Sequence, residues 1–154
     1  MSQSEQIPSE PVQRSGGCLC GMVRLVTKGA PYRTGLCHCL DCRKHHGTLF
    51  HASAVFADTA VTVSGQLAEY QGRYFCPTCG SSVFSRSGDE IEVLLGTFDA
   101  PDQLEPTYEL WTCRREAWLP SFDTLRAYER DRDPGTGRAE PPLAKASATD
   151  SADT

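Results

Sequence analysis

Three cysteines stand within six positions of this chain, at Cys37, Cys39 and Cys42. A cysteine thiolate is a strong ligand for zinc. Structural zinc is almost always held by four protein ligands, whereas catalytic zinc keeps three and leaves one position for water or substrate. This Cys-x-Cys-x-x-Cys spacing supplies one ligand fewer than a closed site, so it predicts a zinc ion that takes part in chemistry.

Four further cysteines form two pairs in glycine- and proline-containing turns. Cys18 and Cys20 are flanked by glycines, and Cys76 and Cys79 enclose a proline and precede a glycine. Such residues favour tight turns that bring two sulfurs to one ion. We expect the two pairs to form one four-thiolate structural zinc site, although spacing alone leaves other combinations open. Cys113 stands outside any ligand spacing and is expected to be a small packed side chain.

The sequence also allows other interpretations of these cysteines. Cys18 and Cys20 could be small buried apolar residues, and Cys-x-x-Cys also occurs in redox proteins, where a helix follows it. Here a strand is predicted after Cys79. The group of Cys37, Cys39 and Cys42 could instead hold a purely structural ion, with a fourth ligand drawn from a nearby side chain. The candidates for that ligand are His38, His45, His46 and Cys113.

The elements that must position these ligands are short strands. Alternating apolar residues and turn signals predict strands, with only a short helix or turn after Arg43. The expected strands cover residues 22–27, 49–56, 60–64, 67–70, 81–85, 90–95 and 108–112. The strands 60–64 and 67–70 are expected to pair as a hairpin around Gly65. The fold class is therefore mainly β, with small antiparallel sheets and little helix.

Length and charge limit the organisation and the partners. The chain has 154 residues and a net charge of −5, enough for one domain, which we place at residues 14–128 between disordered tails at 1–13 and 129–154. A nucleic-acid binder usually shows a basic footprint, which this chain lacks. It also lacks a membrane-length apolar run of ~20 residues and a secretory signal. We therefore expect a cytoplasmic protein with reduced cysteines.

Several motifs in fixed order resemble the glutathione-dependent formaldehyde-activating enzyme family, also called the centromere protein V family. The resemblance covers about residues 14–120. The motifs are Gly-Gly-Cys-x-Cys-Gly (16–21), Cys-His-Cys-x-x-Cys-Arg-Lys (37–44), Gly-Thr-x-Phe (47–50), Phe-Cys-Pro-x-Cys-Gly-Ser (75–81), Gly-Thr-Phe-Asp-x-Pro (96–101) and Glu-Leu-Trp-Thr (109–112).

The resemblance implies a fold, two metal sites and a reaction. Family members have small antiparallel sheets tented over zinc, a fold called the beta-tent. The named activity is that of a carbon–sulfur lyase, run in the direction that joins glutathione and formaldehyde as S-(hydroxymethyl)glutathione. The structural zinc matches Cys18, Cys20, Cys76 and Cys79, and the catalytic zinc matches Cys37, Cys39 and Cys42. The implied partners are a small-molecule thiol and an aldehyde.

Glutathione carries carboxylates, and guanidinium and ammonium groups bind carboxylates. Arg43, Lys44 and Arg73 are the candidate contacts. Arg114 and Arg115 are further cations near the cysteines, and Phe98 and Trp111 are candidate lining residues. His45 and His46 are expected to be solvent-exposed, or else to narrow the site or to transfer protons.

Two classes of function are consistent with the sequence. The first is a zinc-dependent enzyme in which a substrate sulfur takes the open position left by Cys37, Cys39 and Cys42. The second is a non-catalytic binding or scaffold module whose zinc ions only stabilise the fold, a contribution of ~10–16 kcal/mol per site in zinc-finger peptides.

Overall fold

The computed structural model describes residues 9–144, which form short strands and little helix. The single α-helix of this range is α1 (Leu40–His46), and none of its helices is long and apolar enough to cross a membrane. The strands are β1 (Gln13–Gly17), β2 (Arg24–Lys28), β3 (Arg33–Cys37), β4 (His51–Ala57), β5 (Val61–Ser64), β6 (Ala68–Tyr70), β7 (Arg73–Phe75), β8 (Ser82–Ser87), β9 (Glu90–Leu94), β10 (Tyr108–Leu110) and β11 (Arg126–Ala127). The 3-10 turns are η1 (Asp58–Ala60), η2 (Leu95–Thr97) and η3 (Thr112–Arg114).

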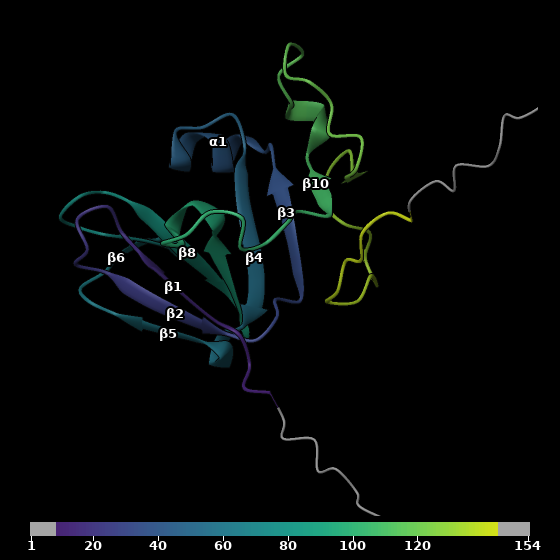
Figure 1. The fold of residues 1–154 in the computed structure, drawn as a ribbon. Coiled ribbons are helices and arrows are strands. Elements are labelled where there is room, and N and C mark those ends of the chain that lie inside the picture. Colours follow the sequence, from purple (N-terminus) through teal and green to yellow (C-terminus); the bar gives the residue numbers. More distant parts are fainter. Residues whose placement is uncertain (1–8, 145–154) are drawn as a thin grey trace, which may run out of the picture.

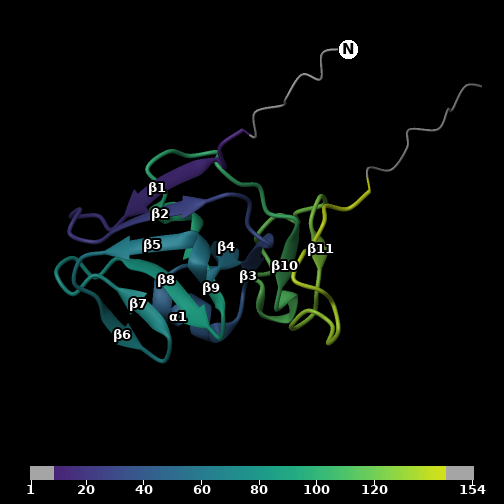
Figure 2. The same cartoon turned by 90° about the horizontal axis from the view of Figure 1, so that it is seen from below.

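Within residues 9–144 the strands form two sheets. The smaller has the order β1-β2-β5, and the larger has the order β11-β10-β3-β4-β9-β8-β7-β6. Figure 1 shows α1 beside the ends of β3 and β4, and Figure 2 shows the small sheet lying over the β8–β9 part of the large one. The mainly β fold class predicted from the sequence is confirmed.

The hydrophobic core lies between the two sheets. Val23 and Leu25 from the β2 side pack with Phe56, Ile91 and Val93 from the large sheet, and all five are almost completely buried. Cys18 and Cys76 belong to the same cluster of buried residues. Two of the four cysteines expected to bind structural zinc therefore lie at the edge of the core, where the two sheets meet.

The predicted hairpin of 60–64 with 67–70 is wrong. The strand β5 pairs with β2, whereas β6 pairs with β7 in the other sheet. Gly65 has a φ of 100°, and a side chain there would collide with the backbone oxygen of Met22. The chain therefore passes closely over the end of β2 at this point and continues into the second sheet.

The expectation that the sheets are antiparallel holds for most pairs but not for β10. This strand lies parallel to β3 on one side and to β11 on the other. Parallel neighbours need a long connection, and the chain travels through six other strands between β3 and β10. The neighbour of β3 therefore comes from the far end of the domain.

Residues after β11 fold back onto the domain through a buried carboxylate. The side chain of Glu140 is 1% exposed and accepts a hydrogen bond from Tyr128 at 2.9 Å. Arg132 lies 2.8 Å from the same carboxylate, and Arg126 lies 3.3 Å from it. A buried charge is tolerated when it is paired and hydrogen-bonded in this way.

These contacts extend the packed part of the chain beyond the predicted boundary at residue 128. The sequence predicts a disordered tail from 129 onward because few apolar residues remain there. In the structure, the ion pairs of Glu140 hold this segment against the domain in place of buried apolar side chains. At the other end β1 starts at Gln13, close to the predicted boundary at 14. Residues 1–8 and 145–154 of the two predicted tails lie outside the described residues.

Gly35 is required by the parallel pair of β3 and β10. It lies opposite Tyr108, and an added Cβ would come within 2.4 Å of the tyrosine ring. We expect Gly35→Ala to lower the free energy of unfolding by about 1–3 kcal/mol, the usual cost of overpacking. Urea unfolding of the zinc-loaded protein measures this change. The control is Gly137→Ala, where the Cβ meets nothing within 4 Å. Equal stabilities of the two variants would contradict the packing.

Candidate functional site

Four cysteines from two distant turns form one group of sulfur atoms. Cys18 and Cys20 follow β1, and Cys76 and Cys79 follow β7; their sulfur atoms all lie within 4.8 Å of one another. The Cys18–Cys20 and Cys20–Cys76 sulfur pairs are 3.6 and 3.7 Å apart. A zinc–sulfur bond of ~2.3 Å in a tetrahedral site gives sulfur pairs at about 3.8 Å. The arrangement therefore fits a tetrahedral metal ion.

Ser81 joins the two turns that carry these cysteines. Its hydroxyl accepts a hydrogen bond from the backbone N–H of Leu19 at 3.0 Å and lies 3.3 Å from the sulfur of Cys79. Hydrogen bonds from Ser81 to the sulfur lower the pKa of Cys79 to about 5. Since metals bind the thiolate form, the turn prepares this sulfur for coordination.

Cys37, Cys39 and Cys42 form the second group, again with all sulfur atoms within 4.8 Å. Cys37 ends β3, and Cys39 caps the N-terminus of α1, where its sulfur accepts the backbone N–H of Cys42 at 3.3 Å. A hydrogen bond from Cys42 is the main cause that lowers the pKa of Cys37 to about 6, against the effect of burial. The strand end and the first helical turn thus hold three sulfurs together.

No fourth ligand joins this second group among residues 9–144. His38 is fully buried, and its Nε2 lies 2.9 Å from the carboxylate of Glu109 on β10. That carboxylate also lies 3.8 Å from Nε of Arg115. His38, which lies between Cys37 and Cys39 in the sequence, is therefore paired with Glu109 and does not join the group of sulfurs. This pairing fixes the turn between the two cysteines.

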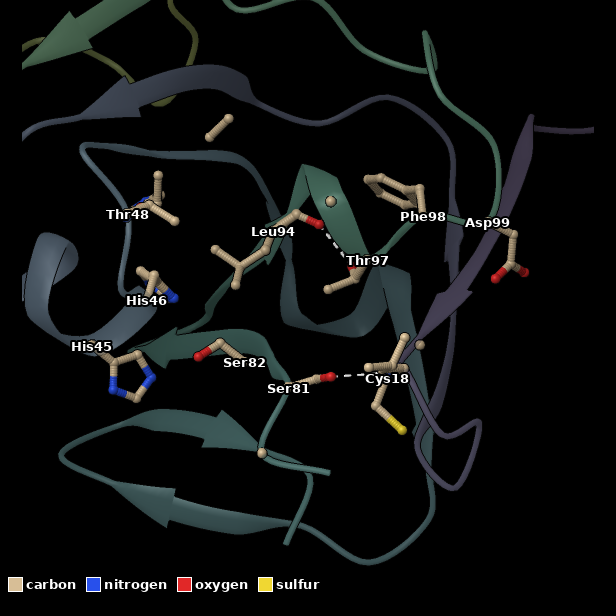
Figure 3. A pocket seen from close by; sticks show the side chains of 16 residues that line it. Cys18, His45, His46, Thr48, Ser81, Ser82, Leu94, Thr97, Phe98 and Asp99 are labelled. Carbon is tan, nitrogen blue, oxygen red and sulfur yellow. Dashed lines mark hydrogen bonds between the residues drawn. The ribbon is translucent and has the colours of Figure 1, made fainter. Parts of the chain in front are cut away.

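His45 and His46 line a cavity of about 620 Å³, in contrast to the expectation that they are solvent-exposed. Figure 3 shows this cavity between the two histidines on one side and Cys18 with Ser81 on the other. We call it the histidine cavity. It is lined by Gly17, Cys18, Leu19, His45, His46, Thr48, His51, Ala52, Gly80, Ser81, Ser82, Leu94, Gly96, Thr97, Phe98 and Asp99.

A smaller cavity of about 260 Å³ reaches the second cysteine group at Cys42, and we call it the cysteine-side cavity. His46, His51 and Leu94 line both this cavity and the histidine cavity. The two spaces therefore adjoin across these three side chains. The smaller one is lined by Cys42, His46, His51, Gln71, Gly72, Arg73, Phe84, Ser85, Arg86, Ser87, Glu92 and Leu94.

His51 and Glu92 are functional candidates that the sequence reasoning missed. His51 lies opposite Cys37 in the β3–β4 pair, and its Nε2 is 2.9 Å from the carboxylate of Glu92. Burial opposes ionisation of Glu92, but hydrogen bonds from His51, Ser53 and Ser85 and the charge of His51 lower its pKa to about 2. The signal available in the sequence was only a histidine in a strand that follows the cysteine motif.

The imidazoles of His45, His46 and His51 form a row that we call the imidazole wall. Each of them holds a ring nitrogen that is buried without a partner. These are Nε2 of His45, Nδ1 of His46 and Nδ1 of His51. The rings follow one another, with centroids 4.8 Å apart for His45–His46 and 5.0 Å apart for His46–His51. An unsatisfied buried polar atom costs about 1–3 kcal/mol. These nitrogens are enclosed within the imidazole wall and are not exposed to either cavity.

Residues 13–114 match a protein family described as glutathione-dependent formaldehyde-activating enzyme. The chain belongs to this family. The family indicated by the cysteine motifs is thereby confirmed. No curated protein matches the sequence. A crystal structure of a Rhodobacter sphaeroides protein is similar with a TM-score of 0.46 and 19% identity, covering 58% of this chain and 91% of that one.

In this member of the glutathione-dependent formaldehyde-activating enzyme family, two of the three predicted carboxylate contacts lie together. Lys44 and Arg73 line a third cavity, of about 310 Å³, with Asp41. We call it the Lys44 cavity, and its remaining lining residues are His45, Tyr70 and Gln71. Arg73 also lines the cysteine-side cavity, so positive charge continues from one space to the other.

The other predicted contacts lie elsewhere. Arg43 donates hydrogen bonds to the carboxylate of Glu116 and to the backbone oxygen of Leu49, and it lines none of these three cavities. Trp111 and Arg114 line a separate cavity together with Cys39, another member of the second cysteine group. Cys113 belongs to neither sulfur group, and it is exposed, so the expectation that it is a packed side chain is wrong. Phe98 lines the histidine cavity, while Arg115 pairs with Glu109 as described above.

The imidazole of His46 should resist protonation in this family member. Burial and the charges of His51 and His45 lower the pKa of His46 from 6.5 to about 4. Because the unfolded chain binds this proton at the higher pH, the folded state loses stability as the pH falls through that interval. We expect His51→Gln to raise the pKa of His46, which NMR titration of its ring protons measures. A midpoint near 6.5 in both proteins would contradict this environment.

Proposed function

We propose that this protein is a zinc-dependent carbon–sulfur lyase that joins glutathione, or a related thiol, to formaldehyde or a related electrophile. The observation that carries the proposal is the second cysteine group. It brings three sulfurs together without a fourth ligand among the described residues, and one of its members, Cys42, lines a cavity. A site of purely structural zinc would be expected to contain its fourth ligand.

The donor sets of both groups suit zinc. Cys18, Cys20, Cys76 and Cys79 would hold a structural ion, and Cys37, Cys39 and Cys42 would hold a catalytic one. Zinc bound by the three cysteines would supply a positive charge that favours the thiolate form of a substrate thiol. The protein's own contribution is to fix the three sulfurs at the junction of β3 and α1 and to leave a cavity beside Cys42.

The charges of the Lys44 cavity, which shares Arg73 with the cysteine-side cavity, favour a thiol with carboxylates. Lys44 and Arg73 offer cations to carboxylates, and Asp41 offers a carboxylate to an ammonium group. Arg73 and Asp41 lie 3.6 Å apart, too far for a close hydrogen bond, so both can still bind a ligand. These groups would orient the tripeptide with its sulfur towards Cys42.

The reaction in the joining direction forms one carbon–sulfur bond and involves no redox change. The thiol sulfur adds to the aldehyde carbon, the carbonyl becomes a C–O single bond, and the thiol proton ends on the new hydroxyl. An aldehyde held next to the thiol reacts faster because bringing the two together removes the entropic cost of their encounter. The alternative, a scaffold module with two structural zinc ions, predicts the same metal content but no reaction.

Metal content should separate the roles of the two cysteine groups. We expect two zinc ions per chain after gentle dialysis, measured by atomic absorption. Cys39→Ser should lose one ion and keep the fold, because Cys39 is only partly buried and its group lies outside the cluster of buried residues between the two sheets. Cys79→Ser should unfold the domain, because its group ties the two sheets together. Circular dichroism reports the fold, and unfolding of Cys39→Ser would contradict the assignment of an open site.

The activity itself can be measured by NMR exchange between glutathione and its formaldehyde adduct. We expect the zinc-loaded protein to accelerate this exchange and Cys39→Ser to abolish the acceleration.

Arg73→Gln should raise KM for glutathione about tenfold, because it loses a charge-assisted hydrogen bond, but should not raise KM for 2-mercaptoethanol, which has no carboxylate.

Lys28→Gln provides the matched control, since this exposed cation lines none of the three cavities. Absence of acceleration by the zinc-loaded wild-type protein at any tested concentration would remove the formaldehyde assignment and favour the scaffold alternative.

A further inference from the structure

The histidine cavity is far larger than a one-carbon aldehyde requires. Its volume is about 620 Å³, within the range of ~300–1,000 Å³ that accommodates drug-sized ligands. Formaldehyde has only two heavy atoms and is close in size to water, which occupies ~30 Å³ in the liquid. Most of this space would stay unused if formaldehyde were the only electrophile.

The charge of the lining shows which substrate the cavity suits. No lysine or arginine lines it among residues 9–144, and its single carboxylate, Asp99, is bound by Arg24 and Ser15. The carboxylates of glutathione would find no cation to pair with there. The thiol therefore belongs with Arg73 and Lys44, and the histidine cavity is left for an uncharged molecule.

The position of the cavity fits this division. It adjoins the cysteine-side cavity across His46, His51 and Leu94. The rest of the lining mixes apolar side chains such as Phe98 with hydroxyls such as that of Ser82 (Figure 3). An aldehyde with a carbon chain would find apolar contacts for the chain and hydroxyl groups for its oxygen.

We propose that the histidine cavity binds the electrophile of the reaction and selects uncharged aldehydes with a chain of several carbons over formaldehyde. This inference rests on the proposed function, because it assigns the substrate class of the same site. The bond changes are those of the formaldehyde reaction: the thiol sulfur bonds to the aldehyde carbon, and the thiol proton ends on the oxygen. No oxidant or further reactant is needed.

Gly96 allows the cavity to be narrowed without strain in the backbone. It lines the cavity, its φ is not in the left-handed region, and an added Cβ meets nothing within 4 Å. Gly137 has the same freedom on the surface and lines none of the cavities named here. Gly96→Leu therefore tests the cavity, and Gly137→Leu is its matched control. Ser82→Leu narrows the cavity independently from β8.

The test compares glutathione exchange with hexanal and with formaldehyde in the full-length, zinc-loaded protein. We expect kcat/KM of the wild type to favour hexanal by at least about tenfold, since each methylene in an apolar pocket contributes ~10-fold or more. Gly96→Leu and Ser82→Leu should each lower the hexanal-to-formaldehyde ratio about tenfold, and Gly137→Leu should preserve it. A wild type that prefers formaldehyde, or a ratio unchanged in both narrowed variants, overturns the inference.

Binding of hexanamide, an uncharged and unreactive analogue of hexanal, separates this inference from the proposed function. Calorimetry should detect it with the wild type and Gly137→Leu and find it at least about tenfold weaker with Gly96→Leu. Such binding without turnover of either aldehyde would overturn the reaction and support the cavity as a ligand site. Turnover of formaldehyde without binding of hexanamide to the wild type would support the reaction and overturn the inference.

Discussion

The meeting of four sulfur atoms between two sheets is the constraint on which the rest of this structure depends. Cys20 and Cys76 are 56 positions apart in the chain, yet their sulfurs lie 3.7 Å apart. Thiolates at this distance repel one another unless a cation lies between them, so the closed arrangement and a bound metal support each other. Fixing this corner places β1 beside the turn after β7. The histidine cavity occupies the space between that corner and α1.

The sequence was sufficient for features set by neighbouring residues and insufficient for those set by strand register. The two cysteine pairs and the three-cysteine motif followed from short spacings and turn residues, because these set how close neighbouring ligands lie. Spacing left open which of them share an ion, and the meeting of the two pairs is a feature of the tertiary structure. The role of His51 could not follow in this way, since it depends on facing Cys37 across β3–β4 and on reaching Glu92 from β9. Nothing in the local sequence specifies either neighbour.

Dependence on contacts between distant parts of the chain also explains where the predicted fold differs from the structure. Gly65 was correctly placed in a turn, but only the tertiary structure shows that this turn connects two sheets rather than two paired strands. The parallel position of β10 beside β3 likewise depends on a contact between the two halves of the chain. Glu140 was assigned to a tail because its surroundings are polar; its burial is balanced by Arg126 and Arg132, which the hydrophobic pattern does not register.

The buried pair of His38 and Glu109 has a consequence for how this family can diverge. His38 is held between two cysteines of the second group, and Glu109 reaches it from a strand 71 positions later. Replacing either partner alone would leave the other polar group buried without its hydrogen bond, a cost that selection acts against. The two positions are therefore expected to change together among homologues. Such covariation would record, in sequences alone, the contact that holds β10 against the cysteine turn.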